Sequence, residues 1–514
     1  MSRKKLPIGI QTFAKIREAD YYYVDKTPFA LKLIEEGVAY FLSRPRRFGK
    51  SLFLDTLAEL FAGNEPLFRG LHCHDKWDWT VKYPVIRISF AEGVMESAAE
   101  LKIRILDILA ENEQCLGLEK GSGEILGRFI RLIQAAKARF GQRVVVLVDE
   151  YDKPILDNLT NLDLAREMRD GLRNLYSVIK GQDAHIKFAM LTGVSKFSKV
   201  NIFSGLNNLN DITLDAAYSD ICGYTDVDVD TVFAPELEGL DRDEIRHWYN
   251  GYNWGGEAVY NPFDLLLLFQ KRVFRPFWFE TGTPTFLVDM LTERKVYLPS
   301  LLKMESSSEL ISTFEVGDIS TEALMFQSGY LTIVGEKRRG SNISFVLAYP
   351  NHEVRSALTG NVMGAWVGNP HKAEESRFAL YDALEINDFD RIREIFFSLY
   401  ASIPNDWFRR SDINKFEGYY ASVFYASFAA LGMDIVPEDV SNQGRLDMAV
   451  KFNGRVYLFE FKVVEDEAEG KALAQIKEKG YADKYRALDQ PIHLIGVEFS
   501  KQKRNVAGFE IEAA

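Results

Sequence analysis

The segment Phe41–Ser51 constrains the fold of this chain more than any other part of its sequence. It follows the apolar run Ala39–Ser43, which predicts a strand, and it leads into the helical pattern Leu52–Ala62. A loop that joins a strand to a helix and ends in Gly-Lys-Ser is typical of phosphate-binding loops, because backbone N–H groups at a helix start attract phosphate oxygens. The alternative is a helix start that binds no ligand.

The loop residues have defined expected roles. Lys50 is predicted to bridge the β and γ phosphates of a nucleotide, and the Ser51 hydroxyl is predicted to hold Mg²⁺. Arg44 departs from the strict pattern, which has a glycine at that position. The residues of the loop expected to bind the nucleotide are Arg46, Arg47, Gly49, Lys50 and Ser51.

A second apolar run supplies the acids that such a site needs. Val144–Val148 predicts a buried strand and is followed by Asp149 and Glu150. We expect Asp149 to bind the magnesium shell and Glu150 to act as the general base on the attacking water. The alternative is that both acids only cap the following segment. The chain has no Asn-Lys-x-Asp pattern for guanine, so ATP is expected rather than GTP.

Alternating strand and helix patterns predict an α/β fold with several domains. Strands are expected at Val85–Phe90, Val144–Val148 and Ile186–Thr192, and helical patterns between them indicate a parallel sheet. Polar residues after the last of these strands, Ser195 and Lys196, could sense the γ phosphate. With 514 residues the chain is too long for one core. We expect a P-loop domain at 1–215 and a helical lid with a small helical or winged-helix-like module at 216–380.

The remaining residues, 381–514, predict a second, separate α/β domain. The expected order is helix Asn387–Ser402, helix Lys415–Leu431, two strands, helix Gly470–Arg486 and strand Ile492–Phe499. Asn453-Gly454 stands between the two strands and is a strong signal for a two-residue hairpin turn. In that register Phe452 faces Arg455, and Asp447 faces Glu460. Strand alternation then places Lys462 on the same face as Glu460.

Two adjacent carboxylates and a lysine on one face indicate a metal-dependent site. Like charges this close are unfavourable unless a cation compensates them. Oxygen ligands without a nearby His or Cys favour Mg²⁺ or Mn²⁺ over Zn²⁺. Asp447 and Glu460 would hold the metal, and Lys462 would orient the nucleophile or neutralise developing charge. The alternative is a hairpin face that carries ordinary surface charges.

Several segments together resemble the prokaryotic AAA-ATPase-like family, which usually carries a C-terminal PD-(D/E)XK nuclease domain. The resemblance covers most of the chain and includes the Arg44 departure. It rests on Tyr22–Thr27, Arg44–Ser51, Val148–Asp152, Leu191–Phe197, Trp248–Tyr252, Glu280–Pro284 and Phe326–Leu331. At the C-terminus the resemblance rests on Asp447, Glu460–Lys462 and the helix around Gln475, and it implies a restriction-endonuclease-like fold.

The resemblance also implies roles for two residues outside the hairpin. By it, Glu417 helps to bind or position the metal, and Gln475 helps to place substrate or water. The proline of the family's name is absent, since Leu446 precedes Asp447. The expected catalytic residues are Glu150, Asp447, Glu460, Lys462 and Gln475, and the expected metal ligands are Ser51, Asp149, Glu417, Asp447 and Glu460.

Charge and composition limit the expected partners. The net charge is −12, so a nucleic acid would have to bind at local basic patches. The longest apolar runs are far shorter than the roughly 20 residues that span a bilayer, so no membrane partner is expected. Three widely spaced cysteines fit reduced thiols in a cytoplasm. The candidate patches are Arg3–Lys5, the cluster Arg44, Arg46 and Arg47, and the stretch with Lys477, Lys479, Lys484 and Arg486.

The leading functional hypothesis is an ATP-binding and ATP-hydrolysing protein coupled to metal-dependent cleavage of DNA, with DNA favoured over RNA. Nucleotide state would control access to the Asp447, Glu460 and Lys462 site. The first rival is a nucleotide-switched sensor whose nuclease-like domain binds nucleic acid without cutting it. The second is an NTPase that acts on protein or RNA. A homo-oligomer is compatible with each hypothesis.

Overall fold

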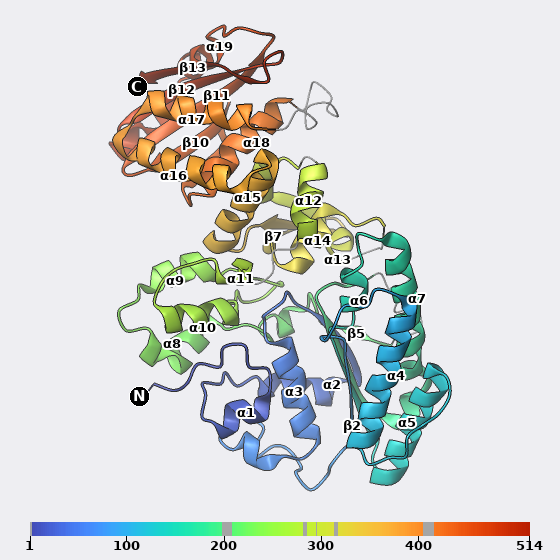
Figure 1. Cartoon of the computed structure of the whole chain (residues 1–514). Coiled ribbons are helices and arrows are strands. Elements are labelled where there is room, and N and C mark those ends of the chain that lie inside the picture. The colour runs from blue at the N-terminus through green and yellow to red at the C-terminus, as the bar shows by residue number, and fades with distance from the viewer. Residues whose placement is uncertain (1–2, 198–207, 281–284, 295, 313–316, 404–415) are drawn as a thin grey trace. The chain divides into compact units, whose positions relative to one another are not determined.

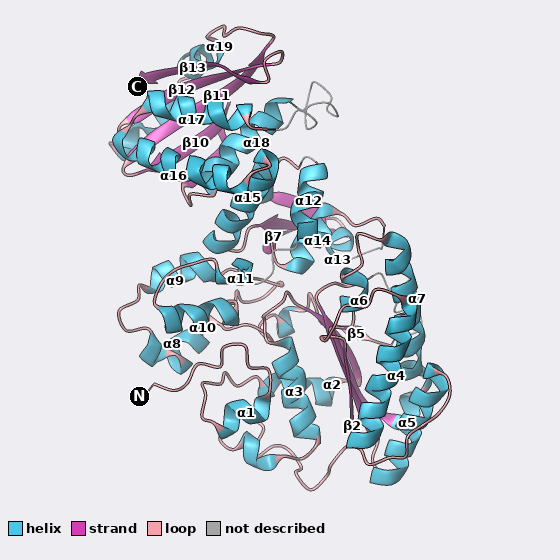
Figure 2. Cartoon of the chain, in the orientation of Figure 1, coloured by secondary structure: helices cyan, strands magenta, loops and turns pink. Residues whose placement is uncertain are grey.

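The computed structural model describes residues 3–197, 208–280, 285–294, 296–312, 317–403 and 416–514. The chain divides into two compact units. The first comprises Met1–Trp278 and Glu305–Asn351, and the second comprises Phe279–Met304 and His352–Ala514. Each unit has its own β-sheet (Figure 2), which confirms the α/β class.

A parallel sheet in the order β2-β3-β4-β1-β5 forms the centre of the first unit. The four predicted strands are confirmed to within two residues at each end, but the two-residue β5 has no sequence signal. The apolar run of β3 is buried throughout, as expected for a parallel strand covered on both faces. The strands are β1 (Ala39–Ser43), β2 (Val85–Ser89), β3 (Val144–Asp149), β4 (Ile186–Gly193) and β5 (Asn210–Asp211).

Helices cover both faces of this sheet (Figure 1). On one side lie α4 (Ala98–Cys115), α5 (Ile125–Phe140) and α7 (Leu162–Gly181), which contact one another. On the other lie α3 (Lys50–Phe61) and α1 (Phe13–Glu18). The short helices α2 (Thr27–Glu36) and α6 (Lys153–Leu156) complete this part.

A helical cluster follows the sheet in the chain. It contains α8 (Asp226–Val232), α9 (Arg242–Tyr249), α10 (Pro262–Lys271) and α11 (Phe277–Glu280). A capping box between Thr225 and Asp228 fixes the start of α8. The buried core of the helical cluster includes Phe233, Tyr249 and Leu265.

Residues 305–351 of the first unit form a small module. It contains α13 (Ser308–Ser312), α14 (Thr321–Ser328) and a sheet in the order β6-β8-β7. The strands are β6 (Met304–Ser307), β7 (Thr332–Arg339) and β8 (Asn342–Ala348). The sequence predicts a small helical or winged-helix-like module in this part of the chain. It gives no strand pattern for the β7–β8 hairpin, whose charged half, Glu336–Arg339, lacks the apolar alternation of a strand.

The second unit contains a mixed sheet in the order β13-β12-β11-β10-β9. Only β11 and β12 pair in parallel; the other neighbours among the described strands are antiparallel. The strands are β9 (Asp434–Val440), β10 (Arg445–Phe452), β11 (Arg455–Val464), β12 (Ile492–Ser500) and β13 (Asn505–Ala513). The helices are α12 (Thr285–Glu293), α15 (His352–Val367), α16 (Pro370–Ile386), α17 (Phe389–Ala401), α18 (Phe416–Ala429) and α19 (Lys471–Glu478).

Two sequence predictions in this unit need correction. The helix expected over Gly470–Arg486 ends at Glu478, and a 3₁₀ helix, Tyr481–Leu488, follows it. Gly480 lies between them with a φ of 57°, a left-handed conformation that ends the α-helix. The strands β9 and β13 were not predicted, because polar and charged residues interrupt their apolar pattern.

The predicted hairpin register is confirmed. Phe452 faces Arg455, and the pairing continues to Met448 opposite Phe459. Asn453 and Gly454 have φ values of 47° and 69°, which is the turn type that favours Asn-Gly. The register therefore holds to one step before Asp447 and Glu460.

Among the described residues, no helix combines the length and the apolar character needed to cross a bilayer.

We predict that Gly454→Ala lowers stability by about 1 kcal/mol, because an L side chain is disfavoured at a left-handed position. A matched control is Gly364→Ala in α15, where an added Cβ meets only ordinary contacts of 3.6 Å or more. This change should be neutral or stabilising. Thermal unfolding of the two variants checks the prediction, and equal melting temperatures would contradict it.

Candidate functional site

The loop after β1 has the geometry of a phosphate-binding loop. It joins β1 to α3, and Gly49 precedes the helix with a φ of 93°. Arg46, Arg47 and Gly49 are exposed, and Ser51 is half-buried in the first turn of α3. Arg47 also has a positive φ of 71°, and its guanidinium lies over the Phe263 ring. The backbone of this loop is therefore accessible to a ligand at the helix start.

The Lys50 side chain folds back over the loop. Its ammonium donates to the carbonyl oxygens of Arg44 and Pro45 at 2.9 Å each. Burial lowers the pKa of Lys50, and the negative charge of Asp149 is the largest opposing effect. The lysine thus lies in the electrostatic field of the predicted magnesium ligand.

Both predicted acids lie where β3 ends. The Thr192 hydroxyl donates to Asp149 Oδ1 at 2.9 Å, which orients that carboxylate. Burial, followed by the charge of Asp149, raises the pKa of Glu150. A carboxylate with a raised pKa is a stronger base, as the expected role of Glu150 requires.

The sheet order explains how these groups come together. Because β4 lies between β1 and β3, the segment Gly193–Phe197 leaves the sheet between the loop and the two acids. In this segment, the backbone N–H of Lys196 donates to the side-chain oxygen of Gln327 at 2.8 Å. The Lys196 ammonium forms an ion pair with Asp211. Ser195, the other expected γ-phosphate sensor, is buried.

Asp152 is a buried polar residue to which the sequence analysis assigned no role. Its carboxylate accepts from the N–H groups of Ser195 at 2.6 Å and Val194 at 3.0 Å. Burial raises its pKa to about 7, although these hydrogen bonds and the Lys50 charge oppose the shift. The Tyr151 hydroxyl donates to the Ser195 carbonyl at 2.8 Å. Asp152 and Tyr151 therefore tie the end of β3 to the segment after β4. The sequence Asp-Glu-Tyr-Asp, which follows the apolar run of β3, is the feature from which a role for Asp152 could have been predicted.

The prediction that Arg44 belongs to a basic patch that could bind nucleic acid is wrong. Its side chain is fully buried. The guanidinium donates to the carbonyls of Ser43 and Thr213 at 2.9 Å and to that of Tyr218 at 3.0 Å, and it lies 4.2 Å from the Trp254 ring. Arg46 and Arg47 stay exposed, but Arg44 is inaccessible to a phosphate backbone.

Four of the predicted residues lie in or beside the C-terminal hairpin. Glu460 is 1% exposed, and its Oε1 accepts from the Lys462 ammonium at 3.0 Å and from the Gln475 amide. Asp447 Oδ2 accepts from the backbone N–H of Phe461 at 2.7 Å. The Asp447 carboxylate thus reaches the residue next to Glu460.

The two faces of β11 have different roles. Phe459 and Phe461 pack against Phe424 of α18, whereas Glu460 contacts Gln475 of α19. Glu417 lies in the first turn of α18, but its side chain is outside the described residues. Its predicted approach to the metal therefore stays a prediction.

Glu498 and Gly496, both on β12, position α19. The buried Glu498 carboxylate accepts from backbone N–H groups at the start of α19, at 2.6 Å from Lys471 and 3.2 Å from Ala472. A Cβ on Gly496 would lie 2.3 Å from the Leu473 nitrogen, so only glycine allows the helix to lie this close. An acid and a glycine within the otherwise apolar run Ile492–Phe499 are the features from which a role for Glu498 and Gly496 could have been predicted.

The donors present suit a hard divalent cation. Asp447 and Glu460 offer carboxylate oxygens of the kind that Mg²⁺ and Mn²⁺ prefer. Within the described part of the chain, no group of three His, Cys, Asp or Glu side chains could hold a metal ion. Water, a substrate phosphate or a residue such as Glu417 would have to complete the coordination.

The other candidate basic patches are largely paired with acids. Arg3 contacts Glu236 and Glu238, and Lys4 contacts Asp20. In the C-terminal stretch, Lys477 pairs with Glu512, Lys484 with Asp439, and Arg486 with Asp483. These pairs hold chain segments together and are mostly exposed, so each contributes little to stability.

Comparison with known proteins assigns both parts of the chain. Residues 7–203 match a family model described as "Predicted AAA-ATPase", and residues 415–509 match the PD-(D/E)XK nuclease superfamily. The chain is also 64% identical over 514 residues to an "Uncharacterized protein in vnfD 5'region" of Azotobacter chroococcum mcd 1, with 100% of both chains covered. The chain therefore belongs to the same family as this relative, and it contains a predicted AAA-ATPase-like domain and, at the C-terminus, a PD-(D/E)XK nuclease superfamily domain.

Proposed function

We propose that this protein binds and hydrolyses ATP in its first unit and uses the nucleotide state to control metal-dependent cleavage of DNA by its second unit. The observation that carries the nuclease part is the group of side chains at β11, where the Glu460 carboxylate contacts Lys462 and Gln475 and the Asp447 carboxylate accepts from the backbone of Phe461. The ATPase part is supported by the position of Lys50, which lies in the electrostatic field of the Asp149 carboxylate.

In the first unit, the loop N–H groups and Lys50 would hold the phosphates. To do so, the Lys50 ammonium exchanges the carbonyls of Arg44 and Pro45 for phosphate oxygens, which carry more negative charge. Ser51 and Asp149 would hold Mg²⁺, which supplies charge neutralisation at the β and γ phosphates. Glu150 would accept a proton from the attacking water, a role that its raised pKa favours.

In the second unit, Asp447 and Glu460 would hold Mg²⁺ or Mn²⁺, which supplies Lewis-acid chemistry at a phosphodiester. The Lys462 side chain is 29% exposed, so part of it is accessible to a substrate. It would orient the nucleophile or neutralise charge on the phosphate. Gln475 would place water or substrate beside Glu460.

One observation favours the rival function, a domain that binds nucleic acid without cutting it. Glu460 Oε1 already accepts two hydrogen bonds, from Lys462 and Gln475. Such a carboxylate is a stable polar arrangement without a metal. Incubation of the protein with plasmid, linear and single-stranded DNA and with RNA, with Mg²⁺ or Mn²⁺ and with or without ATP, separates the two functions.

We predict that Lys50→Ala weakens ATP binding roughly 100-fold, because a charge-assisted contact contributes about 1.5–3 kcal/mol. Lys120→Ala, which removes the same charge at an exposed position, should leave the affinity unchanged. Glu150→Gln should bind ATP normally and turn it over about 10²–10⁴-fold more slowly. Calorimetry and phosphate release measure both effects. An unchanged affinity in Lys50→Ala would remove the loop from nucleotide binding.

We predict that Asp447→Asn and Glu460→Gln abolish DNA cleavage while ATP affinity stays within about twofold of the parent, because the two sites lie in separate units. Lys462→Ala should reduce cleavage more than metal binding. The control is Glu467→Gln, the same change at an exposed position after β11. Cleavage at the parental rate by Glu460→Gln would exclude the hairpin as the active site.

A further inference from the structure

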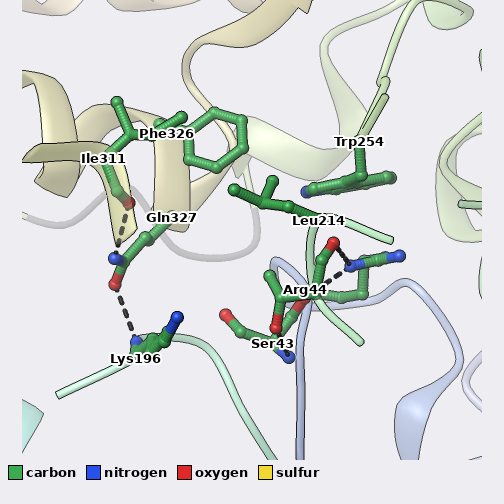
Figure 3. Close-up of a pocket in the computed structure, with 9 residues that line it drawn as sticks. Ser43, Arg44, Lys196, Leu214, Trp254, Ile311, Phe326 and Gln327 are labelled. Carbon is green, nitrogen blue, oxygen red and sulfur yellow. Dashed lines mark hydrogen bonds between the residues drawn. The ribbon is translucent and has the colours of Figure 1, made fainter. Parts of the chain in front are cut away.

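The segment after β4 also contacts the 305–351 module. Gln327, in α14, is 5% exposed and uses both ends of its amide. Its Oε1 accepts from the Lys196 N–H at 2.8 Å, and its Nε2 donates to the Ile311 carbonyl at 2.9 Å. Figure 3 shows this amide between Lys196 and Ile311. A buried amide with both ends bonded fixes the distance between the two backbone segments.

The end of α14 reaches the phosphate loop as well. Gly329, the residue after α14, has a φ of 91°, and a Cβ there would lie 2.7 Å from the Pro45 side chain. Trp278 donates from Nε1 to the Arg46 carbonyl at 3.2 Å, and its ring lies 5.2 Å from that of Tyr330. The same short stretch of the module therefore contacts the loop and the segment after β4.

The packing around this contact is incomplete. A small cavity separates the base of the loop from α14, and its lining includes Arg44, Leu214, Trp254 and Phe326 (Figure 3). Beside this cavity, the Gln327 hydrogen bond joins α14 to the Lys196 backbone.

In the chain, the module lies between two segments of the second unit. Residues 305–351 belong to the first unit, but residues 279–304 before them and 352–514 after them belong to the second. A displacement of the module therefore acts on two of the three chain connections between the units. No other described segment of the first unit is flanked by the second unit on both sides.

We propose that Gln327 is a positioning residue that couples the nucleotide state to the 305–351 module. The inference rests on the proposed ATP-binding function and adds the route by which it acts. Nucleotide contacts that move the segment Gly193–Phe197 would displace the Lys196 N–H, and Gln327 would carry that displacement to α14 and α13. A coupling of this kind needs a linked element with two positions, and the 305–351 module is proposed as that element.

Hydrogen exchange of the full-length protein, with and without ATP and Mg²⁺, tests the proposal. In the parent, ATP should slow exchange in residues 44–51, in α13 and in residues 321–331. Gln327→Met keeps the length of the side chain but removes both hydrogen bonds. It should retain the response of residues 44–51 and reduce that of α13 and residues 321–331 by roughly fivefold, as expected for the loss of a hydrogen bond.

Two further variants sharpen the test. Gln327→Glu keeps an acceptor for the Lys196 N–H but loses the donor to Ile311, so it should retain the response of residues 321–331 and lose that of α13. Gln114→Met makes the same substitution at an exposed position of α4 and should respond as the parent does. The response of residues 44–51 verifies in each variant that the nucleotide site is folded.

The outcomes separate this inference from the proposed function. An equal module response in the parent and Gln327→Met overturns the coupling role while ATP binding stands. Protection of residues 44–51 in the parent without any module response has the same meaning. No protection of residues 44–51 in the parent removes the ATP-binding function, and the inference with it.

Discussion

The buried guanidinium of Arg44 is the interaction on which the nucleotide half of this structure depends. Burial of a charge costs several kcal/mol unless polar groups surround it. Here the cost is offset by backbone carbonyls at the end of β1 and in the segment Thr213–Ser219, and by the Trp254 ring. Burial lowers the pKa of Arg44 only to about 10, so the group stays charged at neutral pH. The charge holds the start of the phosphate loop to the segment that follows β5.

This interaction explains why the loop lacks its first glycine. Arg44 is not among the described residues with positive φ, so its backbone does not need glycine. The left-handed positions of the loop are Arg47 and Gly49. A glycine at position 44 would leave the carbonyls of Thr213 and Tyr218 without this donor. The departure from the strict pattern is therefore a structural feature of the loop.

The elements predicted from sequence are those whose signal is local. A continuous apolar run predicts β3 and its terminal acids, and Asn453-Gly454 fixes the hairpin register from two residues. Both signals depend on residues that are neighbours in the chain or across one turn. For that reason the pairing of Phe452 with Arg455, and with it the pairing of β10 with β11, could be predicted from the sequence.

The missed residues act through contacts that are distant in the chain. Gln327 meets Lys196 across 131 residues, and Asp152 meets Ser195 across 43. No periodicity records such pairs, because each depends on how complete elements pack. The break in the helix at Gly480 was missed for a different reason: a glycine within a helical pattern can be tolerated or can end the helix, and sequence does not decide between them.

The two candidate sites share one physical device, a buried acid that binds backbone N–H groups and so positions a neighbouring polar group. Asp152 holds the segment after β4 beside the nucleotide loop, and Glu498 holds the start of α19 so that Gln475 reaches Glu460. In both, the supporting acid is more deeply buried than the neighbouring polar residue, Lys196 or Gln475. Deep burial makes each acid sensitive to the loss of its hydrogen bonds. The geometry of both sites therefore depends on residues that no substrate would touch.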